Sequence, residues 1–308
     1  MINENNDYSL LSLEYINDYL IKNGYNLFNK LKGIKIQKKC EWNKLYNSLN
    51  LLSIRKNYIE CPEKFSVSLY IQEKLNCKYS SIYNIKNTFI DLYIQRNSFK
   101  RFLSLSTNSS PCNKIKDAHF CICYLFVCLY QIFITETFKE DIIQSLLLIV
   151  ERQILSDIYY IIYPVFLDKM QNKDKQFLEK KNIYIKKNIS EISFLEFDNK
   201  IKETINYKIY AENISNVSKY FSTLDKLNCI KIIYKMVCYD LTEFLKVSEI
   251  GADILLPIFC YIIVISDIKN LFAETEFIKE FVHETFIDGE DGYAMANLET
   301  AINVITDL

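Results

Sequence analysis

Apolar residues recur at every third or fourth position along much of the chain, which is the spacing that places them on one face of an α-helix. This periodicity predicts helices at residues 8–22, 82–103, 142–166 and 224–247. In the last of these, the predicted apolar face consists of Leu227, Ile230, Ile233, Val237, Leu241 and Leu245. The chain has only 5 glycines and 4 prolines, too few for the many tight turns of a sheet-rich fold. We therefore predict an all-α fold.

Polar stretches separate the predicted helices. Residues 104–116 are expected to form a loop, and residues 168–175 are expected to end the helix that begins near residue 142. Residues 180–201 mix polar and apolar positions and are expected to form a loop that carries a short helix. The apolar run 120–134 is shorter than the roughly 20 residues that a membrane-spanning helix needs. It therefore predicts a buried helix and no transmembrane segment.

The charged residues are nearly balanced, with 37 Lys and Arg against 38 Asp and Glu. Proteins that bind nucleic acids usually carry a clear basic excess, so no nucleic-acid partner is expected. The chain contains no Gly-Lys-Ser/Thr phosphate loop and is not expected to be a GTPase itself. Its 2 histidines, His119 and His283, give little support to hydrolytic mechanisms that depend on histidine.

The 10 cysteines and the first residues bear on the compartment and on metal binding. The cysteines lie inside apolar runs, and the first residues lack the basic and apolar regions of a signal peptide. Both features indicate reduced thiols in an intracellular protein. A zinc site at His119, Cys121, Cys123 and Cys128 is an alternative, but structural zinc sites usually show paired Cys-x-x-Cys spacing in a polar loop. No metal and no cofactor are predicted.

A first motif near the C-terminus reads Gly251-Ala252-Asp253-Ile254-Leu255-Leu256-Pro257 and leads into the apolar run 258–265, which predicts a helix. Asp253 is expected to be the N-cap of this helix, where a short carboxylate accepts hydrogen bonds from backbone N–H groups. Pro257 follows four residues later and cannot donate to the carbonyl of residue 253. The two side chains then share one face. An ordinary capped helix start with a proline in its first turn explains the same pattern.

A second motif reads Gly289-Glu290-Asp291-Gly292-Tyr293 and precedes another predicted helix. The glycines permit a tight turn, and the acidic residues favour the positive end of the helix. Helical spacing turns Tyr293, Asn297 and Thr300 away from a predicted buried stripe of Met295, Leu298, Ala301, Ile302 and Ile305. Tyr293 is therefore a candidate contact residue, although a surface tyrosine without a role is an equal alternative in a chain with 23 tyrosines.

Both motifs, in this order and at this separation, resemble the vacuolar protein sorting 9 (VPS9) domain family. The family's pattern is Gly/Ser-Ala-Asp-x-Leu-Leu-Pro, followed further along by Gly-Glu-x-Gly-Tyr-x-x-Thr-Asn-Leu. Three more segments agree: a helix over residues 150–163, the block Asp225-Lys226-Leu227-Asn228-Cys229-Ile230, and Leu271 with Phe277, Ile278 and Phe281. The resemblance thus covers residues 150–308.

The resemblance implies a division of the chain and a function. Residues 140–308 would be a multi-helix layered catalytic domain, and residues 1–139 an N-terminal helical region of unknown role, with a helical bundle near its end packed against that domain. The family consists of guanine-nucleotide exchange factors, which neither make nor break bonds themselves. The implied partner is a small GTPase of the early-endosomal Rab group. The implied location is the cytoplasm, with recruitment to early endosomes or other endocytic membranes.

By the same resemblance, Asp253 is the catalytic residue. Its carboxylate would compete with the nucleotide phosphates for the P-loop lysine and the magnesium ion of the GTPase. Pro257, Tyr293, Ala296 and Asn297 would form the GTPase-binding surface. The chain departs from the family at Ala296, where threonine is usual, and at Ala294, which replaces a second aromatic residue. The alternative is therefore a helical adaptor that binds a Rab without catalysing exchange.

Overall fold

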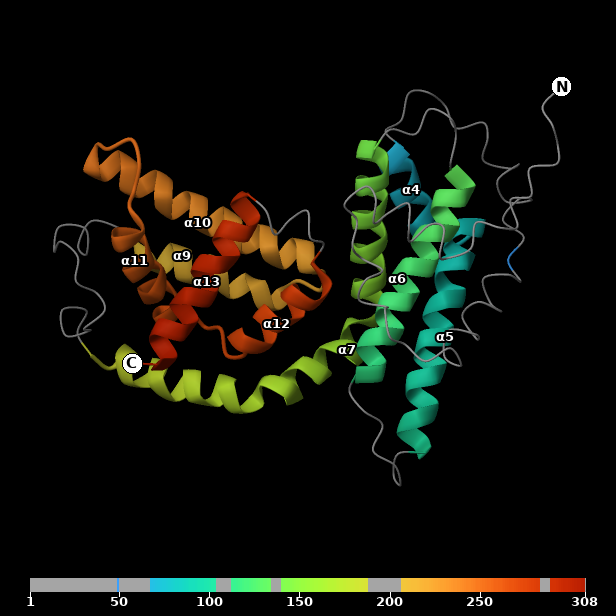
Figure 1. Cartoon of the computed structure of the whole chain (residues 1–308), viewed down its shortest axis with the longest axis horizontal. Helices are drawn as coiled ribbons and strands as arrows, with labels where there is room; N and C mark the ends of the chain where they lie inside the picture. Colours follow the sequence, from blue (N-terminus) through green and yellow to red (C-terminus); the bar gives the residue numbers. More distant parts are fainter. Residues whose placement is uncertain are drawn as a thin grey trace. The chain divides into compact units, whose positions relative to one another are not determined.

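The computed structural model describes residue 49 and residues 67–103, 112–133, 140–187, 206–282 and 289–307, so the helix predicted at 8–22 lies outside the described residues. Within these ranges all regular secondary structure is helical and no strand occurs, which confirms the all-α prediction (Figure 1). The elements are α4 (Val67–Asn76), α5 (Ser81–Leu103), α6 (Cys112–Phe133), α7 (Glu140–Ile185), α9 (Tyr207–Ile214), the 3-10 helix η4 (Ser215–Lys219), α10 (Thr223–Leu245), α11 (Ala252–Ile265), α12 (Leu271–Phe281) and α13 (Glu290–Asp307).

The chain divides into two compact units, and the boundary falls within α7, between Ile158 and Tyr159. The first unit contains α4, α5, α6 and the beginning of α7. The second unit contains the rest of α7 and all later helices. The sequence predicts a domain boundary between residues 139 and 140. Residues 134–139 lie outside the described residues, so this boundary stays a prediction.

The first unit is a helical bundle in which α5 packs against both α4 and α6. α6 is buried along most of its length, as the apolar run 120–134 predicts. The loop expected at residues 104–116 is partly wrong, because α6 already begins at Cys112. Lys86 is buried in this unit, and its ammonium group pairs with the carboxylate of Asp157 at 2.9 Å.

The expected end of the long helix at residues 168–175 is wrong, because α7 continues without interruption to Ile185. Asp174, Phe177, Lys181 and Tyr184 are buried at spacings of three and four, and the polar residues between them lie on the exposed side. The polar stretch is therefore the solvent face of a continuing helix. Two of these buried residues, Asp174 and Lys181, are charged, so a pattern based on hydrophobicity alone does not show the helical periodicity here.

In the second unit, α13 packs against α10 and α11, and α9 packs against the other side of the same two helices (Figure 1). The core that these helices share contains residues from each of them and from α7. The side of α10 predicted to be apolar is buried at Leu227, Ile230, Ile233, Val237 and Leu241, and Leu245 is partly buried. The observed bounds of α10 agree with the predicted helix at 224–247.

Lys226 lies at the centre of this unit, fully buried, and its ammonium group is 2.6 Å from the carboxylate of Glu274 on α12. It also donates to the carbonyl of Val217 at 2.9 Å and to the hydroxyl of Tyr159 at 3.3 Å. Tyr163 donates to the other oxygen of Glu274 at 2.8 Å. Burial lowers the pKa of Lys226, and the charge of Glu274 opposes this shift. One ion pair thus joins α7, η4, α10 and α12.

Two charged residues of α7 hold the ends of neighbouring helices. Asp174 accepts hydrogen bonds from the backbone N–H groups of Phe272 and Ala273, at 2.8 and 3.3 Å, and so caps the start of α12. Lys181 donates to the carbonyls of Ser266 and Ile268 just beyond the end of α11. Negative charge at a helix start and positive charge at a helix end both complement the helix dipole. The continuation of α7 therefore fixes both helices.

None of the helices among the described residues is long and apolar enough to cross a membrane.

The Lys226–Glu274 pair generates a prediction about stability. Lys226→Met leaves a carboxylate buried without a counter-charge and should lower the free energy of unfolding by about 3–5 kcal/mol. Lys226→Met combined with Glu274→Leu should recover part of that loss, since neither charge remains. Urea unfolding of the full chain, followed by circular dichroism, measures both. Lys208→Met removes an exposed pair with Glu212 and serves as the control. Equal stability of Lys226→Met and the control would contradict the central role of Lys226.

Asp174 generates a prediction about pH. Burial raises its pKa from 3.8 to about 6, although the two backbone N–H groups oppose the shift. Between these values the folded state binds a proton that the unfolded state does not, so this contribution to stability is complete below pH 4 and is lost as pH rises through 6. The difference in unfolding free energy between wild type and Asp174→Asn should shift in favour of wild type by about 1–2 kcal/mol as pH falls from 7 to 4. A difference independent of pH would show that Asp174 does not titrate in this way.

Candidate functional site

The start of α11 carries the first candidate residue. Gly251 is the N-cap of this helix, with φ −70° and ψ 152°, and its carbonyl accepts from the N–H groups of Ile254 and Leu255. Asp253 lies in the first turn and its side chain is exposed. The expectation that Asp253 is the N-cap is therefore wrong. The helix begins one residue before it, and the cap makes no side-chain hydrogen bond.

The Asp253 side chain folds back toward Gly251. A Cβ atom on residue 251 would collide with the carboxylate oxygen Oδ1 of Asp253. The backbone angles at residue 251 suit any residue, so a larger side chain there would fit only if the Asp253 carboxylate moved aside. The carboxylate lies in the first turn of α11, near the positive end of the helix dipole. The start of α11 thus presents an exposed carboxylate beside the N-cap of the helix.

Pro257 lies inside α11, one turn after Asp253, and is half-buried. Its ring nitrogen cannot donate the hydrogen bond that the carbonyl of Asp253 would otherwise receive in a helix. Helical spacing puts the two side chains on the same face, as the sequence predicts. Further along α11, the thiol of Cys260 lies 3.9 Å from the carbonyl of Ala301 and marks its contact with α13.

The start of α13 is held against α10 by two ion pairs. Gly289 has a φ of +82°, a conformation that glycine adopts without strain, and α13 begins at the next residue. Asp291 pairs with Lys231 at 2.7 Å, and both side chains are half-buried. Glu290 pairs with Lys235 at 2.5 Å in a more exposed position. The acidic residues of the second motif therefore both complement the helix dipole and bind α10.

Tyr293 is 51% exposed, as expected for a contact residue. Its ring meets the ring of Tyr234 on α10 edge to face, with the centroids 5.5 Å apart. Tyr234 in turn meets Phe259 on α11 edge to face at 6.2 Å. A row of three aromatic rings therefore runs from α11 through α10 to the exposed side chain on α13. The motifs did not reveal Tyr234, and the only signal for it was its place between Lys231 and Lys235 on one side of a predicted helix.

The expected faces of α13 need a correction. Asn297 is buried, not turned outward with Tyr293, and its side-chain amide donates to the carbonyl of Tyr293 at 2.8 Å. Met295, expected in the buried stripe, is only partly buried, and Ala294 is fully buried instead. The reason is that the amide of Asn297 finds its partner one turn earlier on the same helix, so a polar residue can point inward. Thr300 is exposed, as predicted.

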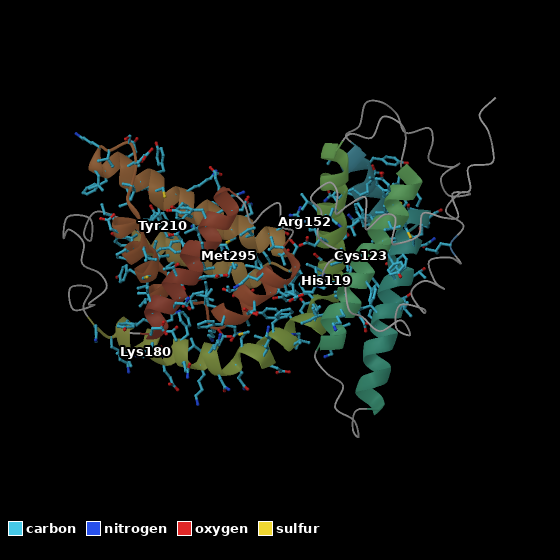
Figure 2. The ribbon with its side chains drawn as sticks, in the orientation of Figure 1. His119, Cys123, Arg152, Lys180, Tyr210 and Met295 are labelled. Carbon is cyan, nitrogen blue, oxygen red and sulfur yellow. The ribbon has the colours of Figure 1, made fainter. Side chains whose placement is uncertain are left out.

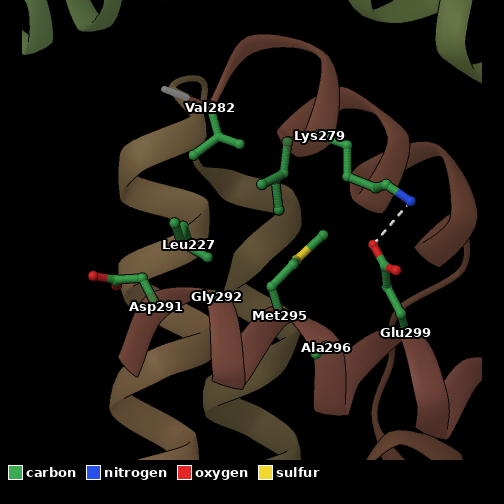
Figure 3. Close-up of a pocket in the computed structure, with 9 residues that line it drawn as sticks. Leu227, Lys279, Val282, Asp291, Gly292, Met295, Ala296 and Glu299 are labelled. Carbon is green, nitrogen blue, oxygen red and sulfur yellow. Dashed lines mark ion pairs between the residues drawn. The ribbon is translucent and has the colours of Figure 1, made fainter. Parts of the chain in front are cut away.

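Ala296 is exposed and lies at a pocket of about 290 Å³ between α10, α12 and α13 (Figure 3). The wall is mostly apolar, and an ion pair between Lys279 and Glu299, 3.1 Å apart, crosses one side of the pocket. The residues that line it are Leu227, Ile278, Lys279, Val282, Asp291, Gly292, Met295, Ala296 and Glu299. The small side chain of Ala296 leaves this pocket open beside the face of α13 that carries Tyr293.

The alternative of a zinc site receives no support from the structure. Among the described residues, no three His, Cys, Asp or Glu side chains are arranged to hold a metal ion. His119 and Cys123 lie on α6 within the first unit, and both are buried (Figure 2). Cys121, Cys123 and Cys128 are fully buried in the same helix, and burial raises the pKa of each thiol.

The site as a whole is a surface that suits a protein partner. It offers an exposed carboxylate and an exposed aromatic ring at the starts of α11 and α13, two helices that pack against each other. Neither group lies in an enclosed cavity that would surround a small substrate. Aromatic residues at the surface are typical of protein interfaces, and an exposed carboxylate adds a group that can bind a cation.

Comparison with known proteins identifies the class of this helical domain. Residues 207–308 match the family model described as the vacuolar sorting protein 9 (VPS9) domain. The chain is also similar to "VPS9 domain-containing protein 1" of Homo sapiens, with 29% identity over 94 residues. That alignment covers 26% of this chain and 15% of the human protein.

Residues 207–308 are therefore a VPS9 domain, and the resemblance inferred from the two motifs is confirmed for this part of the chain. The matched range contains both motifs, with Asp253, Pro257, Tyr293, Ala296 and Asn297. It begins at the first residue of α9 and leaves out α7, whose buried residues complete the core of the same unit.

Proposed function

We propose that residues 140–308 act as a guanine-nucleotide exchange factor that accelerates GDP release from small GTPases of the early-endosomal Rab group. The observation that carries the proposal is the exposed carboxylate of Asp253, held at the start of α11 within a VPS9 domain. We include α7 because Tyr163, Asp174 and Lys181 bind directly to residues of the matched range. Recruitment from the cytoplasm to endosomal membranes belongs to the same proposal.

The proposed mechanism is electrostatic displacement. Asp253 enters the nucleotide site of the GTPase and competes with the nucleotide phosphates for the P-loop lysine and the magnesium ion. An exchange factor accelerates release because it binds the nucleotide-free GTPase better than the nucleotide-bound form. A charge-assisted contact of about 1.5–3 kcal/mol, made only in the nucleotide-free complex, changes the release rate by about 10- to 100-fold.

The other site residues take supporting roles in this proposal. Tyr293 contacts the switch region of the GTPase with its exposed ring, and Pro257 shapes the surface beside Asp253. Asn297 acts from within, since its amide holds the carbonyl of Tyr293. Ala296 contributes a small apolar surface at the adjoining pocket in place of a hydroxyl group.

Asp253 provides the first functional prediction. Release of a fluorescent GDP analogue from an early-endosomal Rab should be accelerated by wild-type protein and slowed about 10- to 100-fold by Asp253→Ala. Asp253→Asn should slow GDP release to a similar extent, because the amide keeps the shape of the side chain but not its charge. Glu249→Ala, which removes another exposed carboxylate just before α11, is the matched control and should leave the rate unchanged. Acceleration that survives Asp253→Ala would refute the mechanism. Binding without acceleration would favour the adaptor alternative.

Gly251 provides a second, independent prediction. Gly251→Ala places a methyl group where the carboxylate of Asp253 lies, so the carboxylate must move although its charge remains. Because the backbone angles at residue 251 suit alanine, the cost in stability should stay below about 1 kcal/mol. The GDP release rate should nevertheless fall several-fold toward that of Asp253→Ala. Thermal unfolding and the release assay on the same preparation separate the two effects. A full exchange rate in Gly251→Ala would show that the position of the carboxylate is not critical.

A further inference from the structure

Tyr234 occupies the position between the two helices that carry the site. Its ring meets Tyr293 of α13 with an interplanar angle of 88° and Phe259 of α11 with an angle of 72°. Edge-to-face geometry of this kind is a favoured arrangement of aromatic pairs. The side chain of Tyr234 is half-buried. It therefore has contacts on both sides and little freedom of its own.

The neighbours of Tyr234 on α10 hold the same turn of α13. Lys231 and Lys235, three residues before and one residue after it, pair with Asp291 and Glu290. Two ion pairs and one ring contact from one side of α10 thus hold the first turn of α13, and the ring contact joins Tyr234 to Tyr293 itself. An exposed tyrosine could otherwise adopt several rotamers. Holding it in one of them lowers the entropy lost when a partner binds.

We propose that Tyr234 is a positioning residue, which holds the ring of Tyr293 in the orientation that the GTPase binds. The inference rests on the proposed function, because it assigns a role to a contact made by Tyr293. Tyr234 acts through Tyr293 and does not itself touch the GTPase. The observations that carry it are the edge-to-face contact, the two ion pairs beside it and the exposure of Tyr293 beyond that contact.

A double-mutant cycle tests this role. GDP release from an early-endosomal Rab is measured for wild type, Tyr234→Leu, Tyr293→Ala and the double variant. Tyr234→Leu alone should slow release about 2- to 10-fold, the range that one aromatic pair contributes. In the Tyr293→Ala background it should have no further effect, because the side chain through which it acts is gone. Effects that multiply in the double variant would overturn the inference.

Two further variants separate positioning from general damage. Tyr234→Phe keeps the ring contacts and should retain release within about 2-fold of wild type, since ring geometry supplies most of the pair's contribution. Tyr239→Leu changes an exposed tyrosine on another side of α10, 65% exposed, and should leave the rate unchanged. A rate as low in Tyr234→Phe as in Tyr234→Leu would contradict positioning by the ring.

The same cycle is also run on the affinity for the nucleotide-free GTPase. If wild type binds the GTPase but does not accelerate GDP release, the proposed exchange function fails. The double-mutant cycle measured on affinity then still tests whether Tyr234 acts through Tyr293. If Asp253→Ala slows release but the cycle is additive, exchange stands and the positioning role fails. If Tyr293→Ala changes neither rate nor affinity, Tyr293 is not at the interface and the inference falls with it.

Discussion

The buried ammonium group of Lys226 is the interaction on which the second unit depends. Its partners come from segments far apart in the sequence: Tyr159 on α7, Val217 on η4 and Glu274 on α12. The rings of Tyr159, Tyr163 and Phe277 surround it at 5.2–5.8 Å from ring centroid to nitrogen. A buried charge without partners is so unfavourable that these segments have to be in place together. This also explains why α7 belongs to the unit although the family match begins after it.

The surface site derives its geometry from this buried pair. Lys226 fixes the beginning of α10, and two turns later the same helix presents Tyr234 to the first turn of α13. Asp174 and Lys181 of α7 fix the start of α12 and the end of α11 in the same way. Groups that act on a partner work best when their supporting side chains are already locked. The exposed residues are thus few, and the residues that place them lie mostly in the core.

Periodicity predicted the all-α fold and the bounds of α10 closely, because the core touches that helix at every third or fourth residue. It failed where buried residues are polar. Asp174 and Lys181 face inward as helix caps, so α7 looked as if it ended within a polar stretch. Asn297 is buried because its amide has a partner in the carbonyl of Tyr293. Hydrophobicity patterns record which residues avoid water, and they do not record which polar groups find partners inside. The sequence did not reveal Tyr234 for a related reason. Its contacts with Phe259 and Tyr293 join residues from three helices, and only the packed structure shows them.

The two alanines that depart from the family pattern have different physical meanings. Ala294 is fully buried in the core of the second unit, so a larger ring there would have to displace its neighbours, and its small size belongs to packing. Ala296 is exposed and opens the pocket beside Tyr293, so its small size changes the surface that a partner meets. The loss of an aromatic residue at 294 therefore removes nothing from the exposed face, since position 294 points inward. The change at 296 alters shape and hydrogen bonding at the face itself. Of the two departures, only Ala296 lies on the surface that the GTPase of the proposed function would meet.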